Sequence, residues 1–266
     1  MKRSILVLGL VIGSIVSTLA ADGIKIISTT KNLSNKAAFN TNIYITATQV
    51  ALENKGGGQN NTFIFNSASE EFTYVDHAKK EYYHFDKATM QQLKQQIKML
   101  MMMMKSFAAN MPEDQKKKLD KIINNDQTEM EFASTGKSSK VGKWGTSIYE
   151  GKTKGEKATD MYIATFKAIG YSQEKFEVMQ KLIQYFKSNL SEIAAFLPTG
   201  GSFSQISFDE TSPVFKDGVP VKTISYENNQ AKNENIVQSI KSESFSNAIF
   251  QAPTGYVRKQ INMQMK

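Results

Sequence analysis

The side chains best suited to metal binding or proton transfer are two histidines, and each has a carboxylate close by in the sequence. His77 follows Asp76 directly, and His84 lies two residues before Asp86. A zinc site needs three or four ligands that converge on one point. We expect His84 to lie on a strand and His77 in the turn before it, so their rings need not meet. The sequence therefore predicts neither a metal site nor a cofactor.

Nucleophilic catalysis has no recognisable machinery in this chain. There is no cysteine, and no serine stands in the Gly-x-Ser-x-Gly pattern of a strained nucleophile turn. The run Gly56-Gly57-Gly58 lacks the lysine that ends a phosphate-binding loop, which favours a flexible hairpin turn. Two carboxylates suffice for glycoside hydrolysis, but no pair stands out here. We expect no catalytic residues and a protein that is not an enzyme, with an unrecognised hydrolase as an open alternative.

Methionine is the residue type with the most unusual placement, because Met99 and Met101–Met104 fall almost in one run. Its flexible thioether suits surfaces that accept varied apolar partners. Three interpretations stay open: a helix packed in the core, an adaptable lining for an acyl chain, or thioether coordination of Cu(I). No histidine and no spaced methionine repeat lies nearby to support the third. For the lining, the candidate ligand-binding residues on this helix are Met101, Met104 and Phe107.

Two helical inserts are predicted, near residues 87–125 and 172–197. From Lys87 the apolar residues recur every three or four positions, which is typical of an amphipathic helix, and an internal proline restarts a second helix. A third helix is predicted to follow Ser172, a good N-cap, and to end before Pro198. About three amphipathic helices are thus expected, each with an apolar stripe that must be buried.

Strand signals dominate the rest of the chain. Short alternating runs separated by polar and glycine turns predict strands at 23–30, 41–53, 62–66, 71–76, 81–85, 128–133, 145–150, 159–167, 203–208, 219–227 and 235–244. The meander over 62–85 carries four aromatic residues that we assign to one inner face as ligand-binding candidates: Phe63, Phe65, Tyr83 and Phe85. We predict an α+β fold, with one domain over 21–266 in which a curved antiparallel β-sheet holds helices on its concave side.

The first twenty residues have the features of a signal peptide. Lys2 and Arg3 precede an apolar run, and small residues suit a signal peptidase, with cleavage after Ala20 or Ala21. We therefore expect export to the periplasm, with secretion as the alternative, and no transmembrane segment in the mature chain. The net charge of +8 is carried mostly by scattered lysines, and Arg258 is the one arginine beyond the signal. Arginine is the side chain best suited to paired hydrogen bonds with phosphates and base edges. Because a single arginine lies beyond the signal, we expect no nucleic-acid binding.

Three short segments lie at intervals along most of the expected mature chain. They are a tyrosine-rich strand pair before a helix, Glu71–Phe85; a glycine turn with a tyrosine strand, Val141–Tyr149; and a closing segment, Asn247–Phe250 leading to Pro253–Tyr256. In their order they resemble an exported bacterial family of unknown function whose fold is similar to the lipoprotein carriers LolA and LolB. The resemblance implies an antiparallel half-barrel with helices in its concave side. It also implies a role in handling hydrophobic ligands or lipoproteins, and offers no catalytic residues.

These expectations combine into a non-catalytic binding or carrier protein for a hydrophobic ligand: a lipid, an acyl chain or a lipidated partner. Apolar side chains of the sheet and of the methionine helix would enclose the ligand, with a gain of about 25 cal/mol per Å² of buried apolar surface. Motion of the helix would open the cup. The competing class is a structural or interaction protein of the envelope, with a protein partner, whose helices fill the cup permanently.

Overall fold

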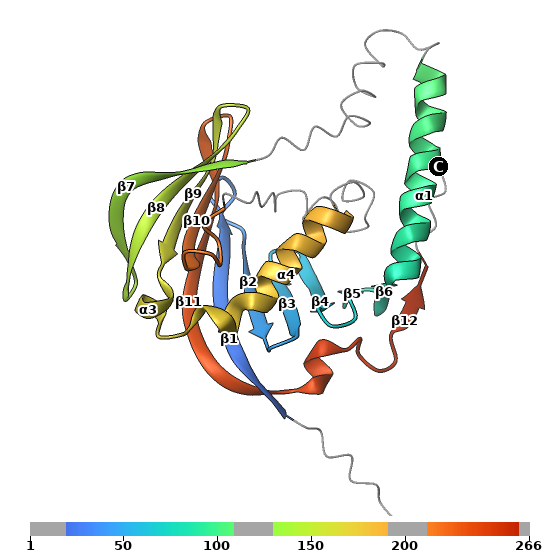
Figure 1. Cartoon of the computed structure of the whole chain (residues 1–266), viewed down its shortest axis with the longest axis horizontal. Coiled ribbons are helices and arrows are strands. Elements are labelled where there is room, and N and C mark those ends of the chain that lie inside the picture. Colours follow the sequence, from blue (N-terminus) through green and yellow to red (C-terminus); the bar gives the residue numbers. More distant parts are fainter. Residues whose placement is uncertain (1–19, 109–129, 191–211, 261–266) are drawn as a thin grey trace, which may run out of the picture.

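The computed structural model describes residues 20–108, 130–190 and 212–260, which form one large sheet with a few helices (Figure 1). The strands are β1 (Ala20–Asn32), β2 (Ala38–Ile45), β3 (Gln49–Gly56), β4 (Gln59–Asn66), β5 (Glu71–Asp76), β6 (Glu81–Phe85), β7 (Glu131–Val141), β8 (Trp144–Thr153), β9 (Glu156–Ala164), β10 (Val219–Glu227), β11 (Gln230–Ser246) and β12 (Val257–Lys259). Their order is β12-β6-β5-β4-β3-β2-β1-β11-β10-β9-β8-β7, and only β12 pairs parallel to its neighbour. The prediction of a mainly antiparallel sheet with few helices is confirmed.

The described helices occupy three places in the chain order. They are α1 (Lys87–Ala108), α3 (Phe166–Ile169), η1 (Gln173–Phe176), α4 (Glu177–Tyr185), the π-helical η2 (Phe186–Leu190) and η4 (Asn247–Phe250). α1 begins at the predicted residue, and η1, α4 and η2 follow one another where the helix over 172–197 is predicted. The end of that helix, the helix predicted after the internal proline and the strand predicted at 203–208 lie outside the described residues, as do residues 1–19 of the predicted signal peptide. Within the described residues, no helix has the length and apolar character needed to cross a membrane.

The single strand predicted over 41–53 is a hairpin of β2 and β3. The chain turns at Thr46, whose N–H donates to the carbonyl of Gln49 over 2.9 Å. The Oγ1 of Thr46 also accepts from the N–H of Gln49 over 3.0 Å. A threonine side chain thus closes this turn without the glycine or proline that usually marks one. The prediction of one long strand is wrong for this reason.

Side chains of β4, β5 and β6 alternate between the two faces of the sheet. On the face that carries α1 and α4, four phenylalanines are buried in the main hydrophobic core: Phe63, Phe65, Phe72 and Phe85. We call these four residues the aromatic face. On the opposite face a smaller core forms around Ile64 and includes a residue of η4. The helices therefore lie over the aromatic face, while η4 covers part of the other.

The first half of α1 packs on β6, whereas its second half runs away from the sheet (Figure 1). Met90, Leu93 and Ile97 recur at helical spacing and are buried in the main core. We call these three residues the α1 stripe. The helix starts after Asp86, whose Oδ1 accepts the N–H of Thr89 over 2.7 Å and so caps the helix. The cap fixes where α1 leaves the sheet.

Removing this cap is expected to lower the free energy of unfolding. Asp86→Ala loses the bond to a helical N–H, and a cap of this kind contributes about 0.5–2 kcal/mol, whereas Asp86→Asn should retain most of it. The same bond lowers the pKa of the Asp86 carboxyl. Its ionic contribution is therefore complete above the ordinary carboxyl pKa and is lost as the pH falls through the lowered value. Urea unfolding at neutral and acid pH measures both effects, and equal losses for the two variants would contradict this assignment.

The C-terminal segment is fixed to the sheet edge by β12 and by contacts just before it. The N–H of Val257 donates to the carbonyl of Lys80 over 3.0 Å. The hydroxyl of Tyr256 lies 3.1 Å from Nδ1 of His77, in the turn between β5 and β6. β12 then runs beside β6 for three residues, which places Arg258 at the edge of the sheet, next to the start of α1.

Candidate functional site

Three of the four predicted aromatic contacts are packed side chains of the core. Phe63, Phe65 and Phe85 are 6%, 2% and 1% exposed. The ring centroid of Phe65 lies 5.1 Å from that of Tyr185 on α4, so helical residues cover the aromatic face. Tyr83, the fourth predicted contact, is half-buried and lines a pocket at the sheet edge. A ligand can reach the first three only when helical residues move aside.

The methionine-rich helix is α1, and exposed methionines lie in its second half. Met99, Met102 and Met103 are 65%, 56% and 42% exposed. The predicted contacts on this helix, whose side chains lie outside the described part, are Met101, Met104 and Phe107. α1 thus combines a buried stripe on the sheet with exposed methionines further along.

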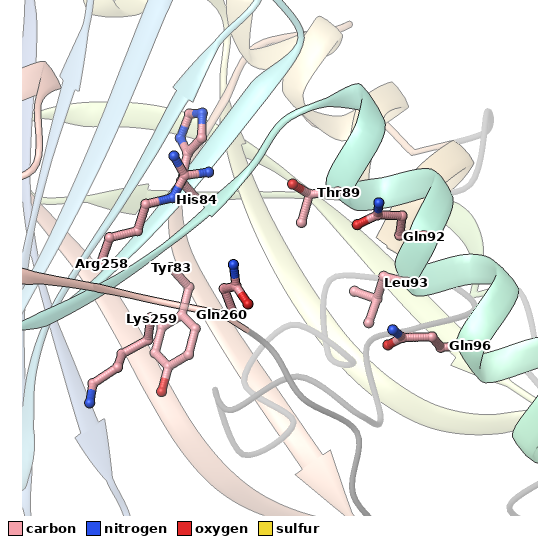
Figure 2. Close-up of a pocket in the computed structure, with 9 residues that line it drawn as sticks. All are labelled: Tyr83, His84, Thr89, Gln92, Leu93, Gln96, Arg258, Lys259 and Gln260. Atoms are coloured by element: carbon pink, nitrogen blue, oxygen red, sulfur yellow. The ribbon is translucent and has the colours of Figure 1, made fainter.

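A pocket of about 450 Å³ lies where α1, β6 and β12 meet (Figure 2). β12 pairs with only the first three residues of β6, and α1 starts soon after β6 ends, so a gap remains between β12 and α1. We call this pocket the notch. Its lining residues are Tyr83 and His84 of β6, Thr89, Gln92, Leu93 and Gln96 of α1, and Arg258, Lys259 and Gln260 of the C-terminal segment. Of these residues, the sequence pattern predicts only the tyrosine as a ligand contact.

The notch is polar and carries positive charge. None of its lining residues is a carboxylate. Lys259 Nζ lies 3.2 Å from a carboxylate oxygen of Glu81, whereas no described residue forms an ion pair with Arg258. The pKa of the Asp86 carboxyl is lowered chiefly by its helix-capping bond, and to a smaller extent by the positive fields of His84 and Arg258. Asp86 is not among the residues that line the notch.

A second pocket, of about 310 Å³, lies on the opposite face of the sheet and shares two residues with the notch. Those residues are His84 and Arg258, and Figure 2 shows the guanidinium of Arg258 beside the imidazole of His84. The second pocket is lined by Glu71, and therefore lacks the uniform charge of the notch. Nδ1 of His84 lies 3.0 Å from Oγ1 of Thr73 on the neighbouring strand, which holds the imidazole against the sheet.

The two histidines do not converge on a common point. His77 lies between the hydroxyls of Thr62, at 2.7 Å, and Tyr256, at 3.1 Å. His84 contacts the hydroxyl of Thr73 instead. In the part of the chain that the structure describes, no three histidine, aspartate or glutamate residues lie close enough to hold a metal ion. Both rings act as hydrogen-bond partners of hydroxyl groups.

Tyr185 carries a buried hydroxyl at the contact between α4 and the aromatic face. Among the described residues this hydroxyl has no hydrogen-bond partner. Burial raises the pKa of Tyr185 to about 12. Tyr185→Phe removes an unsatisfied polar group, so we expect the free energy of unfolding to stay unchanged or to rise by about 1 kcal/mol. Urea unfolding measures the change, and a clear loss of stability would contradict the absence of a partner.

The notch has almost no signature in the sequence. Gln92 and Gln96 flank Leu93 on α1, and glutamines at the polar margin of an amphipathic helix are common. Arg258 stands out only as an isolated arginine. Its position beside α1 depends on the pairing of β12 with a strand far away in the chain, which no local pattern predicts.

No protein-family model and no curated protein matches this chain. Among solved structures, an uncharacterized conserved protein from Thermus thermophilus is similar over 91% of each chain, with a TM-score of 0.46 and 8% sequence identity. Two crystal forms of PNGF-II are similar over 90% of this chain, with a TM-score of 0.38 and identities of 9% and 8%. The matched region spans 31% of the PNGF-II chain. At these TM-scores the similarities carry no argument about function.

Proposed function

We propose that the chain is an exported, non-catalytic binding protein of the periplasm that holds a hydrophobic ligand on the aromatic face. The ligand is a lipid, an acyl chain or a lipidated partner, and the sheet acts as a curved half-barrel of the LolA and LolB kind. The observation that carries the proposal is the cover of the aromatic face, which within residues 20–108, 130–190 and 212–260 includes helical residues but no strand of a second sheet. A helix satisfies its own backbone hydrogen bonds, so it can leave a sheet face without breaking a ladder of strand pairs.

α1 is the helix that we propose as the moving part. Within the described residues it is held to the core by the α1 stripe, and its second half lies away from the sheet. Displacement of the stripe would uncover Phe85 and its neighbours on β6. The exposed methionines would then close over an apolar chain, because the thioether side chain adapts to partners of varied shape. On binding, the ligand would thus replace the α1 stripe as the apolar surface packed against the aromatic face.

A homologous series of primary alcohols tests this proposal. A chain that enters the core gains about 0.8 kcal/mol for each buried methylene, which is about a fourfold gain in affinity per carbon. We expect 1-hexanol, 1-octanol and 1-decanol to displace the neutral fluorophore N-phenyl-1-naphthylamine from the purified chain with affinities that rise at about this rate. Saturation at one site per chain is the second expected result. No saturable binding, or an affinity that does not depend on chain length, would contradict the proposal.

The second candidate function is a structural or interaction protein whose helices fill the sheet permanently. It is favoured by the burial of Phe63, Phe65 and Phe85 beneath helical residues. In that case the helices stay packed on the aromatic face and no ligand takes their place. The alcohol series then gives no binding, while the folded chain stays stable in its absence. The two candidates therefore differ in the outcome of a single titration.

A further inference from the structure

The geometry points to the notch as the binding site for an anionic group, a carboxylate or a phosphate, at the polar end of the ligand. This inference rests on the proposed function, since it assigns the other end of the same molecule. The alternative source of the same chemistry is a free anion that binds in the notch without an apolar chain. In either case the recognised group is a negatively charged oxygen cluster.

The charge of the notch is the first argument. Two lysine or arginine side chains line it and no carboxylate does. Of the two, Lys259 has a carboxylate partner in Glu81, while no described residue pairs with Arg258. A guanidinium presents several N–H donors in a planar fork that matches carboxylate and phosphate oxygens. An anion in the notch would therefore supply a close ion-pair partner for Arg258, on which the Asp86 carboxylate acts only as a more distant charge.

Uncharged hydrogen-bonding groups that line the notch across from the arginine are the second argument. Figure 2 shows Gln92 and Gln96 on the α1 side of the notch, and Arg258 and Gln260 on the side of the sheet edge. Side-chain amides donate through their NH2 groups and carry no charge, so they add donors to an anion site without repelling it. The notch thus combines neutral donors with the positive charges of Arg258 and Lys259 around a space of about 450 Å³.

The continuity of the notch with the apolar core is the third argument. Leu93 belongs to the α1 stripe and also lines the notch. Tyr83 likewise packs against the core and lines the notch. A ligand with its anionic end beside Arg258 would therefore place its apolar part next to the stripe and the aromatic face. The same movement of α1 that opens the aromatic face would admit both ends of such a molecule.

The test compares decanoate and decyl phosphate with 1-decanol, and also measures the binding of inorganic phosphate and acetate by calorimetry. Arg258→Gln removes the charge and the fork, whereas Arg258→Lys keeps the charge alone. Lys137→Gln on β7 is the matched control, because it removes one exposed positive charge at the opposite edge of the sheet. Circular dichroism and urea unfolding establish that all three variants fold like the parent chain.

The expected result is that the anionic decyl compounds bind about tenfold or more tightly than 1-decanol, as for a hydrogen bond to a charged group. This preference should disappear in Arg258→Gln, fall in Arg258→Lys and persist in Lys137→Gln. Inorganic phosphate binding that depends on Arg258, with no binding of any decyl compound, would support an anion site and overturn the proposed function. Binding of all decyl compounds without preference would overturn the anion site alone. No binding of any probe would overturn both.

Discussion

Ile97→Ala is expected to destabilise the folded chain and, at the same time, to tighten its binding of 1-decanol. Ile97 is 3% exposed and belongs to the α1 stripe in the main core. Truncation of a buried isoleucine to alanine typically costs about 2–5 kcal/mol, since apolar contacts are lost and a cavity is left. The substitution destabilises the closed state, in which α1 covers the sheet. It does not destabilise an open state, in which α1 has moved away from the sheet.

The opposite signs follow from competition between α1 and the ligand for the aromatic face. If only a small fraction of molecules is open, the observed affinity is reduced by that fraction. Weakening the closed state by about 2 kcal/mol raises the open fraction, and with it the affinity, by up to about 30-fold. Stability is measured by urea unfolding, and affinity by displacement of N-phenyl-1-naphthylamine with 1-decanol.

Gln95→Ala is the matched control for this experiment. Gln95 lies on the same helix, two residues before Ile97, but its side chain is exposed and does not line the notch. Both the free energy of unfolding and the affinity should stay close to those of the parent chain. If Ile97→Ala loses affinity along with stability, α1 is a permanent part of the core and the second candidate function is favoured.

Phe72→Ala is the second change for which we expect a large effect, here on the free energy of unfolding. Phe72 is 1% exposed and lies at the centre of the aromatic face. Its ring centroid lies 5.5 Å from that of Phe85, 5.6 Å from that of Phe186 and 6.0 Å from that of Phe63. Replacement of a buried phenylalanine by alanine costs about 3–5 kcal/mol, and an aromatic cluster lies at the upper end of that range.

Leu33→Ala serves as the control for that measurement. Leu33 is an exposed apolar residue outside the core, so its truncation should change the free energy of unfolding by less than about 0.5 kcal/mol. The two variants are compared by urea unfolding with a common slope. A loss of less than about 1 kcal/mol for Phe72→Ala would show that the aromatic face is loosely packed, contrary to the burial of its rings.

Local patterns predict the aromatic meander and the start of α1 well. The strands predicted at 62–66, 71–76 and 81–85 correspond to β4, β5 and β6, because each has alternating side chains and a polar turn at its end. α1 begins at Lys87 as predicted, since its apolar residues repeat at helical spacing. In these segments the sequence pattern and the final burial agree.

Two other elements have no such local signal. α3 is only four residues long, and its start is fixed by Thr165, whose side chain accepts the N–H of Ala168. A helix of that length shows no periodicity, so the prediction carried the preceding strand to residue 167 although β9 ends at Ala164. β12 is three exposed residues that pair with β6 across most of the chain, and only the folded sheet brings them together.

The residues of the candidate site also differ in how well the local sequence predicts them. The aromatic residues Phe63, Phe65 and Phe85 follow from alternation along single strands, although alternation does not indicate which helices cover them. The notch forms because β12 pairs with β6, which brings Arg258 to the same pocket as residues of α1. This pairing joins segments that are far apart in the chain. The local sequence pattern therefore predicts the apolar surface but not the Arg258 guanidinium in the notch beside it.

Native mass spectrometry of the chain, isolated gently from the cells that produce it naturally, tests whether it carries a ligand. Organic extraction of the same sample identifies any bound small molecule. We expect one aliphatic molecule per chain, with a carboxylate or phosphate group, which is released when the chain unfolds. A bare chain mass from a folded, stable sample would contradict ligand binding and would favour a sheet whose helices cover it permanently.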